Sequence, residues 1–342
     1  MELTAYLSRI GYVGRAAPTI DTLRELQRLH ISAIPFENLD VLLGRRIDMG
    51  PEAVERKLVA ARRGGYCFEH NTLFRSVLDG IGFRTEAFLG RVRRNVPAEV
   101  RTGLTHTVLR VWTGEDERPW LVDVGFGSLG SPWPVRLDVD AEQATPLEPR
   151  RIISRDGALG FLHQARLGEE WVDLYEFTLQ PAAPVDFEIG NWFSCTHPKA
   201  HFTNNLVVTR VDGTQRVSIF NREFVVRALD GSAERYEIQS PAELIAILGE
   251  RFGLDFPADT VFAAPMLTWS SADSPFRSLK FQSGASSLEW DTQTSAFLEN
   301  PALVRVRGQG SARRGTAAGA ALRSRLRGPM RLRRRGGGTG IA

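Results

Sequence analysis

The hydrophobic periodicity of this chain changes at Gly82, and the change limits what the chain can fold into. Before Gly82, apolar residues recur at spacings of three and four along residues 3–10, 19–29 and 51–61, which predicts helices packed through one face. After it, three segments have the alternation of strands: residues 84–92, 104–112 and 120–124. Helices followed by strands favour an α+β protein with a barrel or strongly curved antiparallel sheet.

The later part of the chain adds more strands and one helix. Residues 152–180 continue the β-like alternation, and Asp212-Gly213 is a favoured pair for a tight turn between residues 206–211 and 216–220. Ser240 followed by a proline and by a glutamate three residues later is a capping box. It predicts a helix that ends at Gly253.

The charge of the chain is distributed unevenly. The net charge is +3, but residues 301–342 contain eleven arginines and no acidic residue, so the remaining 300 residues carry a net charge of −8. The high isoelectric point of the chain is thus a property of its tail and gives no reason to expect a nucleic-acid-binding domain. From about Ser271 the periodic pattern decays, and residues 279–342 are predicted to be a disordered, Arg/Gly/Ala-rich tail. Two explanations fit this composition: a functional basic tail for anionic partners, and a translated frameshift or cloning remnant.

Cysteine content and the N-terminus indicate a reducing cytoplasm. Cys67 and Cys195 are the only cysteines, and no basic segment leads into an apolar run at the N-terminus. No apolar run has the length of a membrane span. No cysteine and histidine spacing typical of a zinc site is present. Residues 125–130 are rich in glycine, but no helical pattern follows them, so they do not form a phosphate-binding loop.

The residues around Cys67 predict a reactive thiol. Gly64 and Gly65 allow a tight turn, and the residues from Phe68 onward have helical spacing, so Cys67 begins a helix. The N–H groups and dipole of a helix N-terminus favour a thiolate, which is the nucleophilic form. A lone cysteine is nevertheless more often a small buried hydrophobe.

A cysteine nucleophile needs a base and a group that orients the base. His106 and Asp123 are the best candidates, because they lie on the two strands of one predicted hairpin. Their order after the cysteine is that of papain-like enzymes. Two other histidines have simpler interpretations: His30 ends a helix, where a cation is favourable, and His70 is a packing or surface residue.

Four motifs, in this order, resemble those of arylamine N-acetyltransferases. They are Ile34–Leu39 (IPFENL), Arg63–Asn71 (RGGYCFEHN), Thr105-His106 and Leu121–Gly127 (LVDVGFG). The resemblance runs from about residue 2 to about residue 278 and includes His201–Leu206. It implies an N-terminal helical bundle over 1–83 with the nucleophile, a central antiparallel β-barrel over 84–190 with the histidine and aspartate, and a C-terminal α/β lid over 191–278. The tail, 279–342, has no counterpart.

The resemblance also implies the activity. A triad of Cys67, His106 and Asp123 in a cysteine-protease-like catalytic core would transfer an acetyl group from acetyl-CoA to an arylamine, arylhydrazine or hydrazide by a ping-pong mechanism. Acetyl-CoA would be a co-substrate, with no permanently bound cofactor and no metal. Members of the family are cytosolic enzymes; the chain is expected to be a monomer or homodimer with no membrane or nucleic-acid partner.

Further residues acquire roles only through this resemblance. The positions matching the acceptor pocket are Phe36, Phe68, Thr105, Phe126 and Phe202. Those matching positions near CoA are Thr102, Gly103 and Gly125. Glu37 and Arg63 match a buried ion pair that supports the site, and such a pair would explain why Glu37 lies in an apolar segment.

Other functions stay open on the sequence alone. An amide synthase of the same superfamily would use the same triad to release a polyketide chain. A catalytically inactive binding module could have the same fold. Transglutaminases and cysteine proteases share the order of catalytic residues, but their local cysteine motifs do not match this chain.

Overall fold

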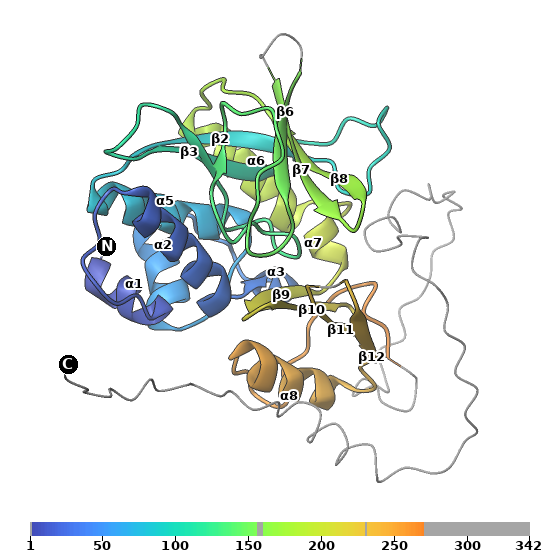
Figure 1. Cartoon of the computed structure of the whole chain (residues 1–342). Helices are drawn as coiled ribbons and strands as arrows, with labels where there is room; N and C mark the ends of the chain where they lie inside the picture. The colour runs from blue at the N-terminus through green and yellow to red at the C-terminus, as the bar shows by residue number, and fades with distance from the viewer. Residues whose placement is uncertain (1, 156–159, 230, 270–342) are drawn as a thin grey trace, which may run out of the picture. The chain divides into compact units, whose positions relative to one another are not determined.

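The computed structural model describes residues 2–155, 160–229 and 231–269, and everything stated below concerns these ranges (Figure 1). The tail predicted from residue 279 onward lies outside them. The described residues form an α+β structure with a group of N-terminal helices and two antiparallel sheets. Within these ranges, no helix is long and apolar enough to cross a bilayer.

The N-terminal region is a helical layer, as the periodicity predicted. Its elements are α1 (Leu3–Ile10), α2 (Ile20–Ala33), β1 (Phe36–Glu37), α3 (Leu39–Leu42), α4 (Pro51–Glu55), a π-helical turn η1 (Arg56–Ala60) and α5 (Cys67–Ile81). The Thr19 side chain caps α2 by accepting a hydrogen bond from the Thr22 amide at 3.3 Å. The helix begun by Pro51 is predicted to bury Ala61, but the π-helical turn changes the register. Val59 is buried instead, and Ala61 is exposed.

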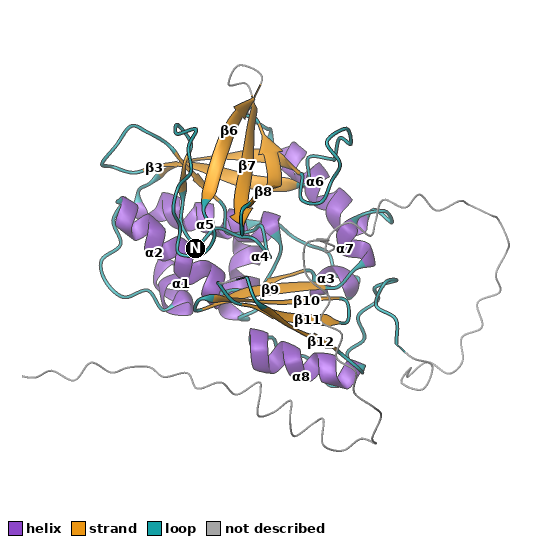
Figure 2. Ribbon diagram, turned by 45° about the vertical axis from the view of Figure 1, so that its right-hand side comes forward, coloured by secondary structure: helices purple, strands orange, loops and turns teal. Residues whose placement is uncertain are grey.

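The larger sheet follows α5 and is nearly closed into a barrel (Figure 2). Its seven antiparallel strands are β2 (Arg84–Val92), β3 (His106–Trp112), β4 (Trp120–Val122), β5 (Val135–Arg136), β6 (Arg150–Arg155), β7 (Gly160–Leu167) and β8 (Glu170–Phe177). They occur in the spatial order β5-β4-β3-β2-β8-β7-β6. The predicted hairpin of β3 and β4 is confirmed, with Leu109 opposite Val122.

Two helices that the sequence pattern did not predict follow the barrel. They are α6 (Pro184–Thr196) and α7 (His201–Asn204). Large apolar side chains of α6 remain exposed, including Val185, Ile189 and Trp192. The helix therefore lacks the buried apolar stripe from which a helix is recognised in a sequence.

The second sheet and one helix complete the described chain. The order of the sheet is β1-β9-β10-β11-β12, with β9 (Val207–Asp212), β10 (Gln215–Phe220), β11 (Glu223–Arg227) and β12 (Ala233–Glu237). Helix α8 (Pro241–Phe252) lies along one face of this sheet (Figures 1 and 2). Its predicted ends are confirmed: the Ser240 side chain accepts from the Glu243 amide, and Gly253 has a φ of 66°.

The short strand β1 ties the helical layer to the second sheet. Phe36 and Glu37 pair with Thr209 and Val208 of β9. The Glu37 amide donates on its other edge to the Gly65 carbonyl at 2.7 Å. The turn that precedes Cys67 is therefore hydrogen-bonded to β1, the edge strand of the second sheet.

Candidate active site

Cys67 is the first residue of α5 and is only 3% exposed. Its thiol is directed at the Thr105 carbonyl, with 3.6 Å between Sγ and the oxygen. Gly125 packs on the backbone of Cys67 from the barrel side. A Cβ on Gly125 would lie 2.7 Å from Cys67 Cα and 3.0 Å from its carbonyl oxygen. The cysteine is thus held at the helix N-terminus, where the dipole favours an anion, and no side chain fits at position 125.

His106 and Asp123 form the polar centre beside the thiol. His106 begins β3, Asp123 follows β4, and both are buried. The Nε2 atom of His106 lies 2.8 Å from Asp123 Oδ2. Because an ionised carboxylate only accepts hydrogen bonds, Nε2 carries the proton of this bond. The other ring nitrogen is left for Cys67.

The electrostatics of the pair favour a charged imidazole. Burial lowers the pKa of His106, but the charge and hydrogen bond of Asp123 outweigh it, and with the hydrogen bond to Cys67 they raise this pKa to about 10. Burial raises the pKa of Asp123, whereas His106 and the donors from Asn71 and Gly125 hold it below its usual value. The arrangement can therefore stabilise an imidazolium beside the thiol, as nucleophilic cysteine catalysis requires.

The sequence and the fold of this chain match known proteins over most of its length. The N-acetyltransferase family model matches residues 19–261. The chain belongs to the arylamine N-acetyltransferase family. An arylamine N-acetyltransferase of Mycobacterium tuberculosis is 39% identical over 257 residues, which are 75% of this chain and 90% of the relative. One from Escherichia coli is 38% identical over 256 residues, or 74% of this chain and 88% of that protein.

Solved structures of the family agree with the fold. The structure of Mycobacterium marinum arylamine N-acetyltransferase in complex with CoA has a TM-score of 0.71 and 40% identity, covering 74% of this chain and 92% of that one. The structure of the M. smegmatis enzyme has a TM-score of 0.72 and 38% identity, covering 75% of this chain and 93% of that one. This member of the family is therefore an acyltransferase.

Asn71 lies beside His106 and Asp123 but was not among the site residues predicted from the sequence. Its Nδ2 atom donates to the Thr107 carbonyl at 2.9 Å and to Asp123 Oδ1 at 3.0 Å. Its Oδ1 atom accepts from the Val124 amide at 3.2 Å. One helical turn after Cys67, Asn71 thus fastens α5 to the strand end that carries Asp123. Its spacing of four residues from the cysteine was the signal that could have identified it.

The four phenylalanines matched to the acceptor pocket lie in two groups. The Phe126 ring lies edge-on to His106 with centroids 5.3 Å apart. Phe36, Phe68 and Phe202 share an apolar cluster with Cys67, in which Phe36 and Phe202 pair with each other at 5.8 Å. Phe68 packs edge-on against Tyr66 and is only 1% exposed. The first of these groups directly adjoins the histidine.

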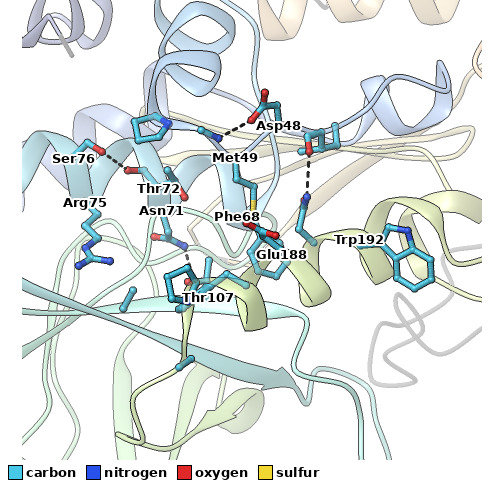
Figure 3. Close-up of a pocket in the computed structure, with 18 of the residues that line it drawn as sticks. Asp48, Met49, Phe68, Asn71, Thr72, Arg75, Ser76, Thr107, Glu188 and Trp192 are labelled. Atoms are coloured by element: carbon cyan, nitrogen blue, oxygen red, sulfur yellow. Dashed lines mark hydrogen bonds between the residues drawn. The ribbon is translucent and has the colours of Figure 1, made fainter.

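Phe68 lines a cavity of about 1750 Å³ on another side of α5 (Figure 3). The α5 residues in its wall are Phe68, Asn71, Thr72, Arg75, Ser76 and Asp79; the opposite walls include Asp48 and Met49 from the loop after α3 and Glu188 and Trp192 from α6. The residues lining this cavity do not include Cys67, His106 or Asp123. Asn71 and Thr107 separate it from the triad.

The remaining matched residues lie around the nucleophile turn and the loop before His106. Thr102 and Gly103 belong to the loop between β2 and β3, where the Thr102 hydroxyl donates to the Val92 carbonyl at 2.9 Å. Glu37 and Arg63 are brought together, with Oε1 and Nη2 2.7 Å apart. Glu37 is fully buried, so the guanidinium provides the counter-charge that its burial demands.

The histidines behind the helix form a buried chain. The Tyr6 hydroxyl bonds to His30 Nδ1 at 2.9 Å, His30 Nε2 to His70 Nδ1 at 2.8 Å, and His70 Nε2 to the Pro35 carbonyl at 3.2 Å. Because a carbonyl only accepts, His70 Nε2 donates to Pro35; with both imidazoles neutral, His30 Nε2 then donates to His70 and the Tyr6 hydroxyl donates to His30. Burial lowers the pKa of His70 to about 4 and that of His30 well below its usual value. The interpretation of His30 as a helix-terminal cation is wrong.

No cluster of metal ligands accompanies these groups in the described ranges. Nowhere in them do three or more histidine, cysteine, aspartate or glutamate side chains converge as metal ligands do. Cys195, the other cysteine, is a free thiol on α6 and is half-buried. Its Sγ lies 3.8 Å from the Trp192 carbonyl of the same helix.

Proposed function

We propose that this protein transfers an acetyl group from acetyl-CoA to the nitrogen of arylamines, arylhydrazines or hydrazides through a thioester on Cys67. The observation that carries the proposal is the placement of the thiol at the start of α5 beside a histidine whose pKa is raised by a buried aspartate. The names of the relatives, and the CoA complex of one of them, support the choice of donor and acceptor.

In the first half-reaction the Cys67 thiolate attacks the carbonyl carbon of the acetyl thioester. The new C–S bond forms, the bond to the CoA sulfur breaks, and the departing thiolate takes the proton held by His106. Asp123 keeps the imidazole ring oriented throughout, because its bond to Nε2 is made in the free protein. The products are free CoA and an S-acetyl enzyme.

In the second half-reaction the amine nitrogen attacks the acetyl carbon on Cys67. The C–N bond forms, His106 accepts a proton from the nitrogen, and the C–S bond to Cys67 breaks. The resulting imidazolium and thiolate are the starting state. Phe126, edge-on to His106, is the aromatic side chain best placed to contact a flat acceptor ring.

Intact-protein mass after brief mixing with acetyl-CoA, without amine, tests the proposal. One acetyl group should be added to the parent and none to Cys67→Ala, and an arylamine should remove it while N-acetylated amine appears. An adduct that persists in Cys67→Ala would refute the assignment. Acylation by longer thioesters but not by acetyl-CoA would instead identify an amide synthase.

We place this reaction in a reducing cytoplasm, since a free thiol is needed at Cys67. Acetyl-CoA acts as a co-substrate that leaves as CoA in every cycle. The protein is expected to act as a monomer or homodimer, and gel filtration with light scattering would decide between the two.

A further inference from the structure

A chain of buried charges runs from β1 to the helix that carries Cys67. Beyond the pair of Glu37 and Arg63, the Arg63 guanidinium lies 3.2 Å from Asp40. Asp40 lies 2.8 Å from the Lys57 ammonium, which lies 2.7 Å from Glu69. The charges thus alternate in sign, and the last of them belongs to the first turn of α5.

Glu69 uses both of its carboxylate oxygens. Oε1 accepts from Lys57, and Oε2 accepts from the backbone amide of Tyr66 at 3.1 Å. Tyr66 is the N-cap residue of α5 and directly precedes the nucleophile. The carboxylate therefore satisfies a backbone donor at the helix N-terminus, where a negative charge is favourable.

The turn is built to let Glu69 reach back. A Cβ on Gly65 would lie 2.7 Å from Glu69 Oε2 and 2.9 Å from Glu69 Cβ, so only glycine leaves this space free. The backbone carbonyl of Lys57 accepts from the Arg63 amide at 3.0 Å. Lys57 is consequently linked to both ends of the turn formed by residues 63–66: its backbone carbonyl bonds to Arg63, and its ammonium is linked to Tyr66 through Glu69.

Lys57 is an unusual choice of cation in this chain. Three of the 43 basic residues are lysines and the other 40 are arginines. Lys57 also lies in the π-helical turn, which redirects its side chain relative to a regular α-helix. Its compact ammonium, with three rotatable donors, lies between two carboxylates from different elements, those of Asp40 and Glu69.

The burial of Glu69 makes its charge depend on Lys57. Glu69 is 2% exposed, and burial raises its pKa to about 7 even though the ammonium of Lys57 acts in the opposite direction. The negative charge of Glu37, on β1, also raises the pKa of Glu69, whereas the hydrogen bond from the Tyr66 amide lowers it. On the far side of Lys57 from Glu69, Asp40 contacts Lys57, and Arg63 in turn contacts Asp40.

We propose that Lys57 is a positioning residue for the nucleophile: it keeps the Glu69 carboxylate ionised and directed at the Tyr66 amide, which fixes the first turn of α5 and the place of the Cys67 thiol. This inference rests on the proposed function, because it concerns acetylation of Cys67. It adds a residue from outside the triad that acts on the acylation step through the helix.

The test measures the rate constant for acetylation of Cys67 by acetyl-CoA, from intact mass, between pH 6.5 and about pH 9. In Lys57→Met the buried Glu69 loses its counter-charge and takes up a proton, so the rate at pH 7 falls about 10-fold, as expected for loss of one charge-assisted hydrogen bond. As the pH rises, Glu69 ionises and the ratio of variant to parent rate rises. A purely structural role would not give this recovery.

Three companion variants show whether Lys57 acts through Glu69. Glu69→Gln should lower the rate, and its rate relative to the parent should not recover as the pH rises, because glutamine does not ionise. Adding Lys57→Met to Glu69→Gln should change the rate less than about twofold, since the coupled partner is gone. Lys57→Arg keeps the charge and should show no recovery with pH. Lys199→Met, an exposed lysine before α7, is the matched control and should follow the parent.

The inference is overturned if Lys57→Met acetylates at a pH-independent ratio to the parent, or if its effect is equally large in the Glu69→Gln background. Should Lys57→Met not fold, Lys57→Gln replaces it, because an amide donates to a carboxylate without bringing a charge. A parent protein that is not acetylated at Cys67 would refute the proposed function itself, which separates the two failures.

Discussion

Replacement of Asn71 by alanine tests the idea that a helix side chain holds the aspartate of the triad. The substitution removes three hydrogen bonds made by one amide, at 2.9, 3.0 and 3.2 Å. It leaves the Thr107 carbonyl and the Val124 amide unpaired in a site where Asn71 is 1% exposed. Asp123 keeps its bonds to His106 and to the Gly125 amide, the latter at 2.8 Å.

The size of the effect follows from those contacts. Two buried backbone groups without partners cost about 1–3 kcal/mol each, so the free energy of unfolding should fall by about 2–6 kcal/mol. Asp123 loses one of its three hydrogen bonds and is held less firmly against His106, so the acetylation rate should fall about 10-fold to 100-fold, in proportion to one hydrogen bond to a charged group.

Chemical denaturation and the acetylation rate of the folded protein measure the two effects separately. Thr72→Ala, at the next position of α5, is the control: its side chain faces the large cavity, and its loss should change neither quantity much. If Asn71→Ala unfolds and reacts like the parent, the amide does not hold Asp123 and the reasoning fails.

Three further predictions concern other residues. Cys195→Ser should retain acetyl transfer and Cys67→Ser should abolish it; the reverse result would exchange their roles. Arg63→Met should cost about 3–5 kcal/mol in the free energy of unfolding, because Glu37 is left buried without its cation; an unchanged denaturation midpoint would show that Asp40 and Glu37 do not need it. Because the pKa of His30 and His70 is lowered by folding, to about 4 for His70, the unfolded chain binds more protons between that value and about 6.5. Their stabilising contribution is therefore complete above about pH 6.5 and is lost as the pH falls toward 4; a Tm that does not fall between pH 7 and pH 5 would contradict this.

The features of the fold that could be predicted from the sequence are those encoded within a few neighbouring residues. The cap of α8 at Ser240, the hairpin turn beside Asp212 and the start of α5 after two glycines each depend on local chemistry. The turn itself is Gly213-Thr214, one residue later than predicted, because Asp212 pairs with Gln215. Helix α6 was missed because its apolar side chains are partly exposed and give no buried stripe. The pairing of β1 with β9 joins residues far apart in sequence, and no local pattern encodes it.

In the candidate site, too, the residues predicted from the sequence are those with a local signal, and the residues missed depend on contacts between distant segments. Cys67 was indicated by its turn, and His106 and Asp123 by their predicted hairpin. The role of Asn71 depends on where the end of β4 lies against α5, and the role of Lys57 depends on Asp40 and Glu69 from two other elements. His30 was misjudged because its neighbours in the fold, Tyr6 and His70, are not its neighbours in the chain.

The pairing of β1 with β9 has a consequence for the synthesis of the protein. The Asn38 amide donates to the Phe202 and Asn205 carbonyls and accepts from the Val207 amide, at 2.7 to 2.8 Å. On the ribosome, all three triad residues emerge well before these partners exist. The pairing that supports the turn before Cys67 can form only after residue 209 has left the exit tunnel, so the nascent chain carries the Cys67 thiol long before the surroundings of that thiol are complete.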